Sequence, residues 1–181
     1  AEGMSAWTKA WKQWVVTADQ LSVEGRWVIE HQLKQLADVV KEIAEVEAHL
    51  SAMTADDRLV EALQKEKGIG PVTAWTLRAE IGQFGRFRTG KQLSRYCGLS
   101  PRNASSGARQ ADAGLIRAGN PQLRATLMEA GHRLMRYEPR WVTFAGNLLR
   151  RGKPKCVVVA AVANRWVRLL FHQMQPSRLA A

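Results

Sequence analysis

Two adjacent serines near the middle of the chain, Ser105 and Ser106, combine a reactive side chain with a suggestive setting. They lie in the stretch LSPRNASSGAR, residues 99–109, with an arginine on each side and Gly107 directly after them. A serine hydroxyl can attack a phosphate when its proton is withdrawn and the developing negative charge is neutralised. By composition alone, serines in such a polar stretch with glycine and proline are more simply turn residues. Both interpretations stay open at this point.

The remainder of the chain offers little other catalytic chemistry. The sequence has no H-E-x-x-H, P-loop or G-x-S-x-G motif, and its four histidines are scattered. Cys97 and Cys156 form no C-x-x-C pair and have no histidine at metal-ligand spacing. We therefore expect no metal site and no cofactor in this chain, and two reduced, buried cysteines.

Charge divides the sequence into two parts. Residues 1–67 carry 8 Lys and Arg against 12 Asp and Glu, whereas residues 68–181 carry 19 against 4, and 16 of those 19 cations are arginine. Because the guanidinium group matches pairs of phosphate oxygens, this excess predicts a polyanionic partner for the second part. Basic surface for solubility alone is the alternative. The most apolar run, residues 156–163, is too short to cross a bilayer, so we expect no membrane partner.

Helical periodicity dominates the first part. Trp7, Trp11, Trp14 and Val15 share one helical face, which predicts a short amphipathic helix over residues 5–17. A longer helix is expected over 21–53, where a heptad seam is formed by Ile29, Leu33, Leu36, Val40, Ile43 and Leu50. This seam fits a coiled coil in a homo-oligomer or packing within the chain. We assign residues 1–58 to an oligomerisation region and 59–181 to a basic domain.

A glycine turn opens the basic domain. Residues 59–82 contain two apolar helical segments joined by Gly68-Ile69-Gly70, with Pro71 at a favourable first helical position. This pattern is typical of a helix-hairpin-helix, whose glycines allow a close approach to a nucleic-acid phosphate.

Further helices are predicted from their capping residues. Thr89 and Gln92 form a capping box for a helix that ends at Gly98, and Asn120 and Pro121 begin a helix that runs to about Tyr137. Residues 110–120 suit a short β-hairpin or an irregular loop, and two more helices are expected over 140–151 and 155–174. The predicted fold class is mainly α, with this short loop or β-hairpin insertion.

The order of these motifs resembles a known family. The stretch from residue 67 to 130 contains G-I-G-P, a G-x-F-x-R-F loop, Y-x-G-L-x-P, S-S-G and G-N-x-x-L-R. It closely resembles the C-terminal transposase domain of the insertion-sequence-one-ten family of DEDD-type, bridge-RNA-guided DNA recombinases. The preceding helix looks like the coiled-coil linker of that family.

The resemblance implies a specific chemistry. The serine before the glycine of the S-S-G motif would attack a DNA phosphate and form a covalent phosphoserine intermediate, which assigns the nucleophile to Ser106, with Ser105 as second choice. Four acids of an RuvC-like domain, which has no counterpart in residues 1–67, would hold Mg²⁺. A guide RNA and a bacterial cytoplasmic, nucleoid-associated location are also implied. The expected DNA-binding residues are Gly68, Ile69, Gly70, Arg86, Arg88, Arg102, Gly107, Arg109, Arg117, Asn120 and Arg124.

A second hypothesis needs no catalysis. The chain could be a helix-hairpin-helix module that binds DNA through its backbone and oligomerises through residues 21–53. Both hypotheses predict salt-sensitive binding to phosphates, and only the first makes Ser106 matter more to chemistry than to affinity.

Overall fold

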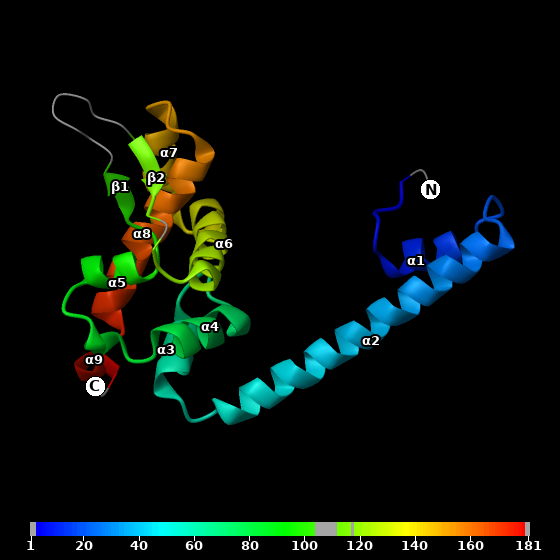
Figure 1. Ribbon diagram of the computed structural model, residues 1–181, viewed down its shortest axis with the longest axis horizontal. Coiled ribbons are helices and arrows are strands. Elements are labelled where there is room, and N and C mark those ends of the chain that lie inside the picture. The colour runs from blue at the N-terminus through cyan, green and yellow to red at the C-terminus, as the bar shows by residue number, and fades with distance from the viewer. Residues whose placement is uncertain (1–2, 104–111, 117, 180–181) are drawn as a thin grey trace. The chain divides into compact units, whose positions relative to one another are not determined.

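The structure, a computed structural model, describes residues 3–103, 112–116 and 118–179, and the chain divides into two compact units, 1–53 and 54–181 (Figure 1). Both units are built mainly from helices, and one small two-stranded sheet lies in the second. The predicted mainly α class is therefore confirmed. Within the described ranges, no helix is long and apolar enough to cross a membrane.

Two helices form the first unit, α1 (Lys9–Thr17) and α2 (Val23–Met53). The helix α1 begins four residues later than predicted, because the Thr8 hydroxyl accepts a hydrogen bond from the Trp11 N–H and caps the helix there. Trp7 thus precedes the helix, has a positive φ and stays 65 % exposed. The Arg26 guanidinium donates to the Ala18 carbonyl and fixes the turn between the two helices.

The second unit begins with α3 (Arg58–Lys65) and α4 (Pro71–Ile81), followed by the short 3₁₀ helix η1 (Phe84–Arg86) and α5 (Gly90–Tyr96). The capping box predicted for α5 is present in part, because the Gln92 side chain binds the N–H of Arg88 and not that of the cap residue Thr89. The Gln92 N–H donates to the Thr89 hydroxyl, and the Gln92 side chain accepts from the Arg88 N–H. Phe84 and Phe87 are buried, so this aromatic pair anchors the loop before α5 on the core.

Strands β1 (Pro101–Asn103) and β2 (Asp112–Leu115) pair antiparallel. Only β2 lies within the range 110–120 predicted for a hairpin or loop, because its partner strand comes from the preceding stretch. Pro101 lies opposite Leu115, and Asn103 lies opposite Asp112. A further backbone bond from the Ile116 N–H to the Ser100 carbonyl extends the pairing at the base.

The last helices are α6 (Pro121–Tyr137), α7 (Pro139–Arg150), α8 (Lys155–Gln173) and α9 (Pro176–Leu179). The helix α8 packs against α5, α6 and α7, and its apolar run 157–163 is helical as predicted. Gly131 lets α6 approach closely, since a Cβ there would lie 3.1 Å from the Val159 carbonyl oxygen. The core of the second unit therefore forms around α8.

Candidate functional site

The base of the hairpin is fixed to the core of the second unit. Leu99, directly before β1, is buried, and its carbonyl accepts a 2.9 Å hydrogen bond from the Asn164 side chain of α8. The same amide donates to the Ser94 hydroxyl of α5 at 2.7 Å. One side chain of the central helix thus holds both α5 and the start of the hairpin.

Two glycines shape the junction between α5 and the hairpin. Gly98 has φ +68°, its N–H bonds to the Arg95 carbonyl, and the Leu99 N–H bonds to the Ser94 carbonyl. This Schellman motif ends α5 at the predicted residue. Gly119, with φ +104°, brings its backbone against Gly98, because a Cβ there would lie 2.7 Å from the Gly98 nitrogen. The two ends of the hairpin segment are therefore held together by glycine-to-glycine contact.

The predicted nucleophile lies on the connection between these strands. Ser105, Ser106, Gly107 and Arg109 fall in segment 104–111, which joins β1 to β2 and lies outside the described residues, as does Arg117. The described structure therefore supplies the frame of the serine motif: two paired strands whose bases are anchored on α5, α8 and α6.

The glycine turn between α3 and α4 uses its three residues differently. Ile69 is buried, and its N–H donates to the Glu66 carbonyl. Gly68 has φ +83° and lies against Leu134, while Gly70 caps α4 without a side-chain hydrogen bond. The side chain of Ile69 therefore belongs to the core. The turn can bind a phosphate only through the backbone of its two half-buried glycines.

The predicted cationic contacts separate into exposed and structural groups. Arg88 and Arg102 are exposed, and the described structure gives their guanidinium groups no ion pair or hydrogen bond. Arg86 is also exposed, and its guanidinium carbon lies 4.7 Å from the ring centres of Phe87 and Tyr96. Arg86 and Arg88 thus lie at the loop before α5, and Arg102 lies on β1, the strand that enters the serine motif.

Unlike these exposed arginines, Arg124 and Asn120 make hydrogen bonds within the fold. The Arg124 guanidinium donates to the Ala118 carbonyl, lies over Gly98 and has a buried Nε with no hydrogen-bond partner among the described residues. The Asn120 side chain caps α6 by accepting from two backbone N–H groups and donates to the Glu80 carboxylate. Neither prediction as a DNA contact is tested here, and both side chains already have structural partners.

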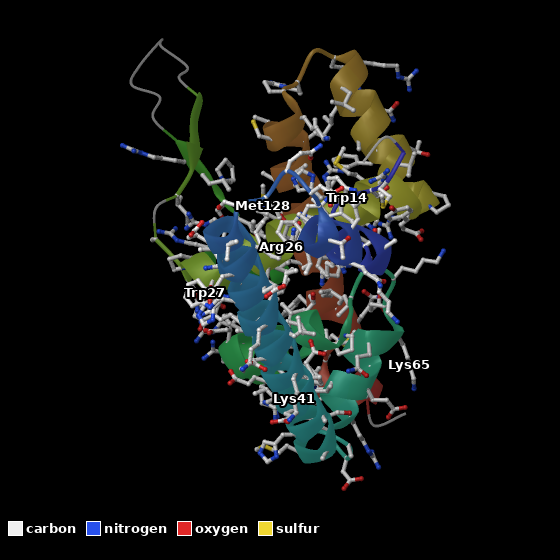
Figure 2. All side chains as sticks on the ribbon, turned by 90° about the vertical axis from the view of Figure 1, so that its right-hand side faces the viewer. Trp14, Arg26, Trp27, Lys41, Lys65 and Met128 are labelled. Atoms are coloured by element: carbon white, nitrogen blue, oxygen red, sulfur yellow. The ribbon has the colours of Figure 1, made fainter. Side chains whose placement is uncertain are left out.

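A groove of about 470 Å³ lies beside the hairpin base, and nothing in the sequence indicated it. One wall comes from α8 and the other from Leu99, Pro101, Gly114 and Leu115, with Met128 of α6 between them. Met128 is labelled on α6 in Figure 2. The two walls lie more than forty residues apart in the chain, so no local sequence pattern could have indicated the groove. The groove is largely apolar, and Arg165 and Arg168 lie on its α8 side.

The two cysteines differ in their surroundings, so the expectation that both are buried is wrong for one of them. Cys97 lies in the core, and burial raises the pKa of its thiol to about 12. Cys156 is exposed because it lies in the first turn of α8, on the groove side.

An ion pair stabilises the start of the second unit. Asp57 caps α3 and accepts from the Arg78 side chain at 2.6 Å. Partial burial acts to raise the pKa of Asp57, but the hydrogen bond and charge of Arg78, together with two backbone N–H groups, hold that pKa below its usual value.

Within the described ranges, no group of three or more His, Cys, Asp or Glu side chains could hold a metal ion. Because Mg²⁺ prefers several oxygen ligands, these described residues do not offer it a site.

Part of the second unit is similar in sequence to known proteins. Residues 60–145, which include α4 to α6 and the whole hairpin, match the family model described as Transposase IS116/IS110/IS902 family. The chain is 31 % identical over 150 residues to a "Probable family 20 transposase" of Pseudomonas aeruginosa, an alignment that covers 77 % of this chain and 43 % of that protein.

Two further relatives carry insertion-element names. The transposase for insertion sequence element IS1111A of Coxiella burnetii is 28 % identical over 127 residues, covering 67 % of this chain and 35 % of that protein. The insertion element IS110 uncharacterized 43.6 kDa protein of Streptomyces coelicolor is 26 % identical over 148 residues, covering 82 % and 36 %. The chain thus spans less than half the length of each of these three relatives.

Proposed function

We propose that the chain, whose residues 60–145 match the IS116/IS110/IS902 transposase family model, acts in DNA transposition and supplies a serine nucleophile. The nucleophile is Ser106, with Ser105 as second choice. The observation that carries the proposal is the extent of the family match, which covers α4 to α6, the paired strands and the S-S-G motif together.

The proposed reaction is a phosphoryl transfer to a hydroxyl. The Ser106 oxygen forms a bond to the phosphorus of one DNA strand, and the bond between that phosphorus and a deoxyribose oxygen breaks. The serine proton passes to a base, and the leaving oxygen takes up a proton. The product is a phosphoserine ester that preserves the energy of the phosphodiester for a later strand transfer. Cations near the reacting phosphate stabilise the charge that develops on its oxygens.

Three features of the second unit support this assignment. The strands on either side of the serine motif are anchored to the core through Leu99 and the Gly98–Gly119 contact. Arg102 of β1 and Arg88 of the loop before α5 are exposed, without carboxylate partners in the described structure. The basic part of the chain carries only four acids, so a DNA backbone meets little repulsion there.

Other components of the reaction are part of the proposal. We propose that Mg²⁺ is held by the acids of an RuvC-like domain outside residues 1–181, and that a guide RNA selects the DNA target. Both follow from the family resemblance of residues 67–130.

We also propose that the chain forms a homo-oligomer through α2. None of the 31 residues of α2 is buried, and Val40 and Ile43 of the predicted seam are more than half exposed. Trp27, labelled on α2 in Figure 2, is 65 % exposed. A second copy packed along this seam would remove Val40 and Ile43 from water.

The serine assignment is tested by trapping the covalent intermediate. The full-length transposase that contains this chain is incubated with a nicked suicide DNA substrate, and protein–DNA adducts are separated under denaturing conditions. We expect Ser106→Ala to abolish the adduct while duplex binding is retained, and Ser100→Ala to leave the adduct unchanged.

The same experiment separates the two functions. A non-catalytic binding module would give no adduct with the unsubstituted protein, although DNA binding would persist. An adduct that survives in the Ser106→Ala and Ser105→Ala variants would show that another residue is the nucleophile.

A further inference from the structure

The turn between α7 and α8 concentrates positive charge that has no part in the serine site. Residues 150–155, here called the basic turn, read Arg-Arg-Gly-Lys-Pro-Lys, and all six are exposed. From residue 139 to 181 the sequence contains no Asp or Glu. The ion pairs of the described structure do not include any cation of the basic turn. Among the residues that the structure describes, no carboxylate therefore neutralises its charges.

The backbone of the basic turn is fixed by hydrogen bonds. Gly152 has φ +73°, its N–H donates to the Leu149 carbonyl, and the Lys153 N–H donates to the Leu148 carbonyl. This Schellman motif ends α7, and Pro154 then begins α8, with its carbonyl accepting from the Val158 N–H. The cations thus project from an ordered backbone, which lowers the entropy lost when they bind a ligand.

The basic turn lies beside the hairpin that carries the serine motif. Cys156 and Val157, the residues that follow the turn, line the same groove as Pro101 of β1 and Gly114 of β2. Figure 1 shows the α7–α8 turn at the end of the second unit from which the paired strands extend. A DNA strand that reaches the hairpin therefore passes close to the positive charges of the basic turn.

We propose that Arg151, Lys153 and Lys155 form a contact surface for the sugar–phosphate backbone of duplex DNA. This inference rests on the proposed function and adds residues that the sequence had not indicated. Three like charges within five residues repel one another, and phosphate anions relieve that repulsion. Arginine and lysine side chains can bind the phosphates of any sequence, so the proposed contact positions DNA through its backbone.

The test is the salt dependence of DNA binding by the full chain. Fluorescence anisotropy with a labelled 30-base-pair duplex, from about 50 to 300 mM salt, gives the slope of log K against log salt. Each lost phosphate contact makes this slope less negative by about 0.9, so the triple variant Arg151→Gln, Lys153→Gln, Lys155→Gln should lower its magnitude by about 2–3. The same change should appear with duplexes of unrelated sequence.

Two matched variants control the measurement. Lys9→Gln, Lys34→Gln and Lys41→Gln remove the same charge from the first unit and should leave the slope within about 0.5 of the original. Arg151→Lys, Lys153→Arg and Lys155→Arg retain the charge of the turn and should keep the original slope. Thermal unfolding by circular dichroism checks that each variant is folded.

The outcomes distinguish this inference from the proposed function. A chain that binds duplex DNA with a steep slope, unchanged in the triple variant, would overturn the inference and leave the proposed function standing. A loss of affinity for a hairpin RNA without any loss for duplex DNA would also overturn it. If the unsubstituted chain bound no DNA, the proposed function and the inference would fail together.

Discussion

The helices α2 and α8 differ most in what surrounds them. The helix α2 has 31 residues and none of them is buried, whereas α8 has 19 residues and eight are buried, among them Val162, Trp166 and Leu170. Both have apolar residues at helical spacing. For α8 that spacing meets three other helices of its own unit, and for α2 it meets water along much of its length. Periodicity therefore identifies a helix, and long-range packing decides whether its apolar face is already covered.

The largest expected loss of stability comes from α8, the helix whose apolar face is already covered within its own unit. Trp166→Ala removes the largest fully buried side chain of α8, and we expect it to lower the free energy of unfolding of the second unit by about 3–5 kcal/mol. Urea denaturation followed by circular dichroism measures the loss. A loss below about 1 kcal/mol would mean that α8 is not the centre of the core.

A smaller loss in the free energy of unfolding is expected from a substitution at the hairpin base. Gly119→Ala would place a Cβ 2.7 Å from the Gly98 nitrogen on a backbone with φ +104°, and it should cost about 1–3 kcal/mol. Gly152→Ala is a matched control, since its φ is +73° but a Cβ there meets no atom within 4 Å. If both variants lost the same stability, the backbone angle and not the close contact would explain the effect.

The Asp57–Arg78 pair should make the free energy of unfolding of the second unit depend on pH in the acid range. Because the folded pKa of Asp57 is lowered, its stabilising contribution is complete above the usual value of 3.8 and is lost as the pH falls through the folded pKa. Asp57→Asn keeps a good helix cap and removes the charge, so it should cost about 1 kcal/mol at neutral pH. Urea denaturation at pH 7 and at pH 2–3 should show this difference disappearing in acid. A difference that is constant with pH would contradict the ion pair.

The smallest effect on stability is expected on α2, where the readout is association. Val40→Ala and Ile43→Ala should change the free energy of unfolding by less than about 0.5 kcal/mol at concentrations where the chain is monomeric. In sedimentation they should weaken self-association of the full chain. Val39→Ala and Val46→Ala, equally exposed but off the seam, should leave association unchanged. Equal weakening by both pairs would reject the seam as the interface.

Local hydrogen bonding explains what the sequence predicted well. The capping pairs Thr89–Gln92 and Asn120–Pro121, and the glycine that ends α5, act within a few residues, so the boundaries of these helices could be predicted closely. The same reasoning placed the α1 start too early, because a cap at Thr8 competes with the apolar spacing of Trp7.

Tertiary packing explains what the sequence missed. The burial of Ile69, the position of Arg124 over Gly98 and the exposure of Cys156 each depend on elements far away in the chain. The groove and the place of the basic turn beside the hairpin depend on α8 meeting β1 and β2. The proposed role of Ser106 rests on the family resemblance, since by composition alone this serine is more simply a turn residue.

Peptide mapping of the trapped adduct tests the central claim most directly. After nuclease and protease digestion of the full-length protein bound to suicide DNA, mass spectrometry identifies the residue that retains a nucleotide. The account predicts one modified peptide from residues 103–109, with the nucleotide on the hydroxyl of Ser106. A nucleotide attached to a tyrosine, or to a serine outside that segment, would contradict it.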